Sequence, residues 1–146
     1  MRVLLDVNVL VRANERSRGP ARTLLLTLIE KGHTLLTSRE LLVELARVLR
    51  YPRLQALLKL TEEQIHAYVQ FLRGICETVE LEHSLPVSMR DPNDIYVLQT
   101  AVLGEADIIC TLDRDFYAPE TAIFCATLGI EVCSDTELAA RTSAKS

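Results

Sequence analysis

The sequence has 146 residues, of which 49% are hydrophobic and 25% charged, with a net charge of −4, as is typical of one soluble domain with a hydrophobic core. No apolar segment reaches the roughly 18–20 residues that a transmembrane helix needs, and Asp6 and Asn8 interrupt the only apolar stretch near the N-terminus, which argues against a signal peptide. The four cysteines lie far apart without a C-x-x-C motif, so we expect reduced cysteines in a cytoplasmic protein, without a membrane partner, rather than a disulfide framework or a zinc site.

The first part of the chain alternates apolar strands with helices. Residues 2–6 are expected to form a strand, residues 21–32 a helix that stops at glycine, and residues 33–37 a second strand. A capping box of Thr37 and Glu40 then predicts the start of a helix that runs to about Arg50 and is broken at Pro52.

The second part of the chain repeats this alternation. "TEEQ" and "SDTE" match capping boxes, and an Asp91-Pro92 pair is a typical helix start. The expected elements are, in order, a helix at 61–76, a strand at 78–81, a helix at 92–103, a strand at 107–112, a helix at 119–128, a strand at 130–133 and a helix from 134.

Strands that are apolar throughout and that alternate with helices indicate a parallel sheet covered on both faces. The nearly all-apolar strand at 107–112 is expected to be central. We therefore predict one three-layer α/β/α domain over residues 1–140, with a central parallel sheet of about five strands, and a C-terminal tail at 141–146.

Acidic residues follow the predicted strands at the edge where ligands bind to open α/β sheets. Asp6 ends the first strand, and Asp113 and Asp115 follow the fourth. Asp94 lies in the first turn of a helix, on its apolar face with Leu98. Each position has a structural alternative: a helix cap for Asp6 and Asp94, and a surface turn paired with Arg114 for the other two.

Glu44 is a fourth candidate from a separate segment, at the boundary of the apolar stripe of its helix. Its structural alternative is an i,i+3 ion pair with Arg47. Carboxylates gathered in one place repel one another, and a hard divalent cation such as Mg²⁺ or Mn²⁺ removes that conflict. Such a cation orients and activates water and neutralises charge on a phosphodiester, so a metal-dependent phosphodiesterase is the predicted class.

Basic residues are concentrated at the start of the chain. Residues 1–60 carry 11 Lys and Arg against 5 Asp and Glu, whereas residues 61–146 carry 5 against 15, and 13 of the 16 basic residues are Arg. Arginine favours phosphate recognition, although a solvated surface is an equal alternative. Arg12, Arg39 and Arg47 are candidate phosphate contacts.

Three segments in order, "LLDVNVLVRA", "TSRELLVELARVLRYPRL" and "RDPNDIYVLQTAVLGEADIICTLDRDF", resemble the motifs of PIN-domain nucleases, closest to prokaryotic toxin–antitoxin toxins. The resemblance covers roughly residues 2–137 and implies a flavodoxin-like fold with a metal-dependent ribonuclease site. It maps the family's four acids onto Asp6, Glu44, Asp94 and Asp113, with Asn8, Thr111 and Asp115 in support. Val7 departs from the pattern, since a hydroxyl residue is usual there.

The resemblance implies a Mg²⁺- or Mn²⁺-dependent endoribonuclease toxin with Asp6, Asp94 and Asp113 as metal ligands and Glu44 at a second metal or the attacking water. It also implies an RNA substrate, a small protein antitoxin and a homodimer. The alternatives are a PIN-fold RNA-binding or scaffolding module without catalysis, supported by Val7, and an RNA-processing nuclease without toxicity.

Overall fold

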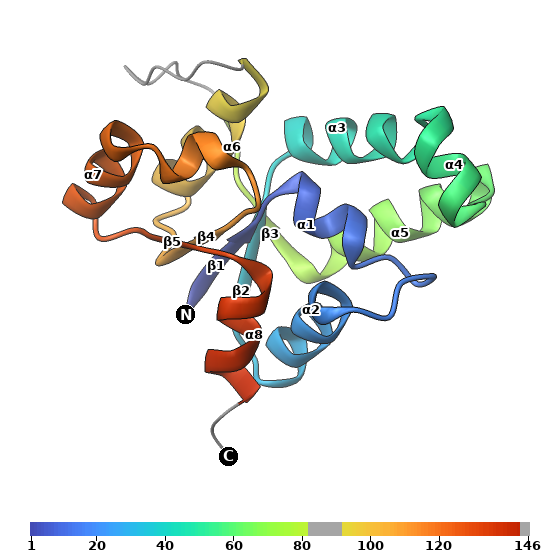
Figure 1. The fold of residues 1–146 in the computed structure, drawn as a ribbon, viewed down its shortest axis with the longest axis horizontal. Coiled ribbons are helices and arrows are strands. Elements are labelled where there is room, and N and C mark those ends of the chain that lie inside the picture. Colours follow the sequence, from blue (N-terminus) through green and yellow to red (C-terminus); the bar gives the residue numbers. More distant parts are fainter. Residues whose placement is uncertain (82–91, 144–146) are drawn as a thin grey trace.

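The computed structural model describes residues 1–81 and 92–143 of the chain. Within them lies a parallel sheet of five strands in the order β3-β2-β1-β4-β5 (Figure 1). The strands are β1 (Arg2–Leu5), β2 (Thr34–Thr37), β3 (Cys76–Thr78), β4 (Ile108–Cys110) and β5 (Glu131–Cys133). The predicted parallel sheet of about five strands is therefore confirmed, with β1 rather than β4 at its centre.

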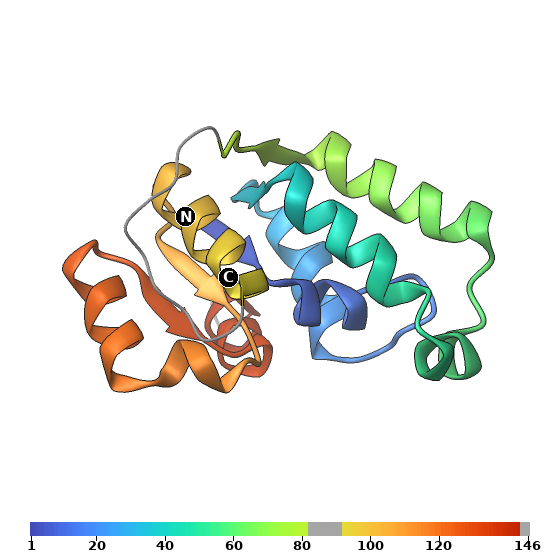
Figure 2. The ribbon, with the colours of Figure 1, turned by 90° about the horizontal axis from the view of Figure 1, so that it is seen from above.

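Helices cover both faces of this sheet. The helices of the described residues are α1 (Val7–Arg12), α2 (Pro20–Glu30), α3 (Arg39–Leu49), α4 (Pro52–Leu58), α5 (Glu62–Ile75), α6 (Pro92–Leu103), the 3₁₀ helix η1 (Arg114–Tyr117), α7 (Pro119–Thr127) and α8 (Asp135–Ser143). Helices α2 and α8 pack together on one side of the strands, and α6 contacts β1 and β2 from the other side (Figures 1 and 2). None of the helices in the described ranges is long and apolar enough to cross a membrane.

The interior strands are apolar on both faces because both faces are covered. Val3 and Leu4 of β1 and Ile109 of β4 are each 0% exposed. The register joins Leu5 of β1 to Cys110 of β4, so these two strands end side by side. Whatever follows them in sequence meets at the carboxyl edge of the sheet.

Two of the three predicted capping boxes are confirmed. In α5 the hydroxyl of Thr61 accepts from the backbone N–H of Gln64 at 3.1 Å. In α8 the hydroxyl of Ser134 accepts from the backbone N–H of Glu137 at 3.1 Å. The box at Thr37 is wrong, because Thr37 is the last residue of β2 and Ser38 caps α3 instead. Ser38 has extended backbone angles, and its hydroxyl accepts from the backbone N–H of Leu41.

Three other boundaries differ from the prediction. The third strand is at Cys76–Thr78 rather than 78–81, because the chain leaves α5 directly into pairing with β2. Pro52 begins helix α4 as well as ending the one before, as proline suits a first helical turn. Helix α8 continues to Ser143, three residues into the expected tail, since Thr142 is buried and its hydroxyl donates to the carbonyl of Leu138. The predicted cap Asp91 lies outside the described residues.

Candidate active site

Asp6 lies immediately after β1 at the carboxyl edge of the sheet. Its backbone N–H donates to the carbonyl of Cys110 at 2.9 Å, which continues the pairing with β4 by one step. Asp6 is 5% exposed, and its carboxylate Oδ1 accepts from the backbone N–H of Val7 at 2.6 Å as the N-cap of α1. Asp6 is therefore a helix cap, and its second oxygen remains directed to other partners.

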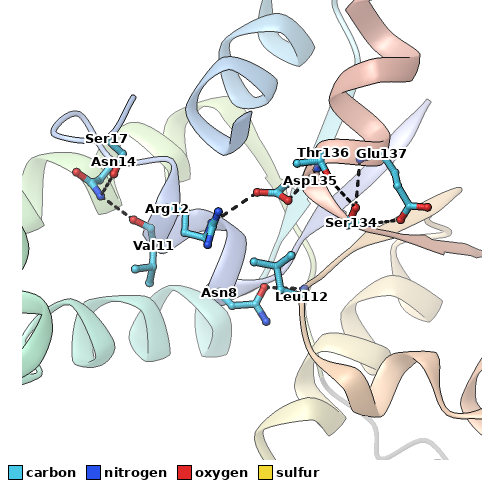
Figure 3. Close-up of polar contacts among 10 residues, drawn as sticks. All are labelled: Asn8, Val11, Arg12, Asn14, Ser17, Leu112, Ser134, Asp135, Thr136 and Glu137. Carbon is cyan, nitrogen blue, oxygen red and sulfur yellow. Dashed lines mark hydrogen bonds and ion pairs between the residues drawn. The ribbon is translucent and has the colours of Figure 1, made fainter. Parts of the chain in front are cut away.

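Thr111 and Asn8 bind that second oxygen. The Thr111 hydroxyl donates to Asp6 Oδ2 at 2.6 Å, and Asn8 Nδ2 donates to the same oxygen at 3.3 Å. Thr111 Oγ1 also accepts from the backbone N–H of Asp113 at 3.0 Å. The opposite end of the Asn8 amide accepts from the backbone N–H of Leu112 at 3.2 Å (Figure 3). Helix α1 and the end of β4 are thus joined around one carboxylate.

Three more carboxylates gather beside this network. Asp94, in the first turn of α6, Asp113 and Asp115 each offer an oxygen, and these oxygens all lie within 4.8 Å of one another. Asp113 is the N-cap of η1, and its Oδ1 accepts from the backbone N–H of Asp115 at 2.9 Å. That turn explains why two acids separated by one residue face the same place.

A cleft of about 460 Å³ opens over these groups. Its acidic lining comes from four different segments, and consists of Asp6, Glu40, Glu44, Asp94 and Asp113. Asn8, Arg39, Val43 and Tyr96 are among the other residues of its wall. The four acids expected from sequence are therefore brought to one cleft.

The carboxylates that line the cleft are suited to bind a cation. Burial raises the pKa of Asp6, and the charge of Asp113 raises it further, against the lowering effect of the bonds from Thr111, Val7 and Asn8. Among the described residues, no basic side chain forms an ion pair with Asp6 or Asp113. Clustered carboxylate oxygens of this kind fit a hard divalent cation, which prefers oxygen ligands.

Glu44 is in the cleft wall but is already paired. Its Oε1 accepts from Arg47 Nε at 3.1 Å, which is the i,i+3 pair that the sequence offered as the alternative. The Arg47 guanidinium also lies 5.9 Å from the centre of the Tyr51 ring. Glu44 therefore lies in the cleft wall as part of an exposed ion pair, outside the cluster of Asp94, Asp113 and Asp115.

The three candidate arginines have different surroundings. Arg39 lines the cleft. Arg12 lies one turn after Asn8 on α1, where its Nε is 3.6 Å from Oδ2 of the buried Asp135 (Figure 3). Arg47 is held by Glu44. Tyr96, 42% exposed in the cleft wall, was not singled out from sequence, and its place two residues after Asp94 gave no signal, because residues i and i+2 of a helix do not face each other.

A comparison with known protein families found a match. Residues 2–115 match the family described as the PIN domain, so the chain belongs to the PIN-domain family. PIN domains are generally nucleases and usually use divalent metals. No curated protein matches the sequence.

Among solved structures, the chain is similar to one from the crystal structure of VapBC2 from Rickettsia felis bound to a DNA fragment from their promoter. The TM-score is 0.56 at 15% sequence identity, and the match covers 92% of this chain and 98% of that one. At this identity the likeness concerns the fold.

Proposed function

We propose that this protein is a Mg²⁺- or Mn²⁺-dependent endoribonuclease and the toxin of a toxin–antitoxin pair. One observation carries the nuclease proposal: Asp6, Asp94 and Asp113, from three separate segments, line a single cleft at the carboxyl edge of the sheet. Membership of the PIN-domain family supports it. An acidic cleft without a bound cation would repel an RNA backbone, so the proposed substrate and the proposed metal require each other.

Asp6, Asp94 and Asp113 would hold the metal, directly or through water, with Asp115 beside them. When bound there, a divalent cation would lower the pKa of a water molecule and neutralise charge on the scissile phosphate. Glu44 would position the attacking water or a second metal. Cleavage is proposed to be hydrolytic, leaving a 5′-phosphate and a 3′-hydroxyl.

The neighbouring donors favour the ionised form of Asp6. Thr111 and Asn8 both donate to Oδ2, and Val7 donates its backbone N–H to Oδ1, so three bonds oppose the rise in pKa that burial causes. The role expected of a hydroxyl at position 7 is thereby open to Thr111, whose hydroxyl already donates to Asp6. This favours an active site over an inactive RNA-binding module.

The toxin assignment draws on the structural neighbour, whose title describes a VapBC2 complex with promoter DNA. We propose by analogy a small protein antitoxin as partner, and a homodimer. Leu57 of α4 is 75% exposed and offers apolar surface for either contact.

The nuclease proposal is tested by incubating purified protein and RNA with Mg²⁺ or Mn²⁺. We expect cleavage that stops in excess chelator and that Asp6→Asn or Asp94→Asn abolishes, with circular dichroism showing an unchanged fold. Glu63→Gln, on the exposed first turn of α5, is the control and should cleave normally. Cleavage that persists in chelator or in both aspartate variants would refute the mechanism.

Induced expression in bacteria separates a toxin from an RNA-processing nuclease. A toxin arrests growth when expressed without its antitoxin, and Asp6→Asn relieves the arrest. Normal growth of cells that contain an enzyme active in vitro would favour RNA processing.

A further inference from the structure

A second pocket continues the acidic cleft along the surface between α3 and α5. It has a volume of about 270 Å³ and is lined by Arg39, Leu42, Val43 and Ala46 of α3, Val69 and Arg73 of α5, and Thr78. We call it the α3–α5 pocket. Arg39 and Val43 line both this pocket and the acidic cleft. A chain lying in the cleft can therefore extend into the pocket without leaving the surface.

The two helices that form the pocket lie side by side (Figure 2). The floor is apolar, from Leu42, Ala46 and Val69, and Val43 stands between pocket and cleft with 60% of its surface exposed. A flat, uncharged ring suits such a floor better than a hydrated ion does. Tyr96, on the cleft side, adds an exposed aromatic ring on which a base can stack.

The charge of the pocket is positive. Arg39 and Arg73 supply guanidinium groups, and within the described ranges neither forms an ion pair. Nearby arginines of the same surface differ: Arg47 is paired with Glu44, and Arg50 with Glu62 at 2.8 Å. Guanidinium groups that are not already paired are suited to bind phosphate.

We propose that the α3–α5 pocket is a nucleotide-binding subsite for single-stranded RNA, next to the phosphate that is cleaved. One unpaired base lies on the apolar floor, and Arg39 and Arg73 contact the flanking phosphates. This assigns to Arg73 a part in substrate binding and rests on the proposed ribonuclease function. Stacked bases of a duplex do not reach such a floor, so the subsite selects single strands.

A partner peptide is the other occupant that an apolar pocket with basic edges would take. Continuity with the acidic cleft favours RNA, because a bound strand has to extend beyond the scissile phosphate on at least one side. The assay therefore measures RNA binding directly, in the absence of any partner.

The experiment is fluorescence anisotropy of the full chain with a short fluorescein-labelled single-stranded RNA, with Ca²⁺ in place of Mg²⁺ to neutralise the acidic cleft, and with gel electrophoresis to check that the RNA stays intact. We expect Arg73→Ala to raise Kd about tenfold and to lower the slope of log K against log salt by about 0.7, as for the loss of one phosphate contact on a single strand. Arg53→Ala is the matched control, because Arg53 is exposed on α4 and outside the pocket and the cleft, and should bind like the wild type.

A second pair of variants tests the pocket without removing an arginine. Val43 is exposed, so Val43→Glu and Val43→Gln should both fold, and only the first adds a negative charge between pocket and cleft. We expect Val43→Glu to weaken RNA binding several-fold more than Val43→Gln. Equal binding by these two variants, together with an unchanged Kd and salt slope in Arg73→Ala, would overturn the proposal.

These results are independent of the nuclease test. If the protein cleaves RNA in a metal-dependent way, but Arg73→Ala and the wild type bind RNA equally well, the nuclease proposal stands and the subsite proposal is rejected. Binding that depends on Arg73, in a protein that does not cleave RNA with Mg²⁺ or Mn²⁺, would retain the subsite and reject the nuclease.

Discussion

Thr111 donates its hydroxyl hydrogen to Oδ2 of Asp6 at 2.6 Å, from the end of one strand to the end of the strand beside it. The same oxygen of Thr111 accepts from the backbone N–H of Asp113 at 3.0 Å. One fully buried hydroxyl therefore binds the carboxylate of Asp6 and the backbone of Asp113, two of the proposed metal-binding residues. It also lowers the pKa of Asp6 against the effect of burial.

Thr111→Val tests this role while keeping the shape of the side chain. Without the hydroxyl, the pKa of Asp6 rises further, and protons compete better with the metal. We expect Mn²⁺ affinity at neutral pH to fall about 10- to 100-fold, as for other residues that orient metal ligands. Isothermal titration calorimetry measures the affinity, and Thr111→Ser, which keeps the hydroxyl, should bind nearly as the wild type does. Equal Mn²⁺ affinity in the Val and Ser variants would contradict this role.

Gly104 is needed for close packing rather than for a left-handed backbone. The residue with positive φ after α6 is Glu105, at 53°. A Cβ at Gly104 would lie 2.9 Å from the carbonyl oxygen of Thr100 and 2.9 Å from a methyl of Val79. We expect Gly104→Ala to lower the free energy of unfolding by about 1–3 kcal/mol, measured in urea.

Gly74→Ala is the matched control for that packing effect. Gly74 is in helix α5, and a Cβ there meets nothing within 4 Å. The substitution should therefore stabilise the protein by up to about 1 kcal/mol through helix propensity. If Gly104→Ala lowers the free energy of unfolding and Gly74→Ala raises it, crowding by the added Cβ, and not the loss of glycine, causes the loss of stability at Gly104.

Tyr68 connects α5 to α1. Its hydroxyl donates to the carbonyl of Leu10 at 2.6 Å, and both residues are buried. In Tyr68→Phe that carbonyl still accepts from the backbone N–H of Ala13 at 3.1 Å, so it is not left without a donor. We expect a loss of about 1 kcal/mol in the free energy of unfolding. Tyr51→Phe, at a 41% exposed tyrosine, should change it little. A loss for Tyr68→Phe no larger than for Tyr51→Phe would mean that the bond adds nothing net.

Much of the candidate site could be predicted from the sequence, from the local rules of helices and from the way parallel strands end at one edge of a sheet. Asp6 and Asp113 were predicted to lie near each other because they follow two apolar strands that end at one edge of the sheet. The position of Asp94 at the same edge was predicted from its place in a first helical turn, on the apolar face of the helix. The pairing of Glu44 with Arg47 was also open to prediction, because i,i+3 neighbours on a helix face each other.

Features that depend on packing between distant segments were not predictable. The register of β3 is set by where α5 ends against β2, and the sequence pattern alone favoured residues 78–81 instead. Arg39 and Arg73 come to one pocket only because α3 packs against α5. The contact of Arg12 with Asp135 joins opposite ends of the chain, and no local spacing indicates it.

The N-terminus of α8 provides a prediction about pH. The carboxylate of Glu137 accepts from the backbone N–H of Ser134 at 2.8 Å, and its pKa is lowered from 4.5, chiefly by this bond and by the Ser134 hydroxyl. A carboxyl group whose pKa is lower in the folded protein contributes stability above its unfolded pKa, and that contribution is lost as pH falls through the folded pKa.

A glutamine side chain in place of Glu137 would keep an acceptor but no charge near the helix N-terminus. Glu137→Gln should therefore lower Tm at neutral pH, and the difference from the wild type should shrink towards zero well below pH 4.5. Thermal unfolding followed by circular dichroism measures both, with Glu15→Gln, at an exposed residue outside the helices, as the control. A difference that stays constant with pH would contradict the assignment.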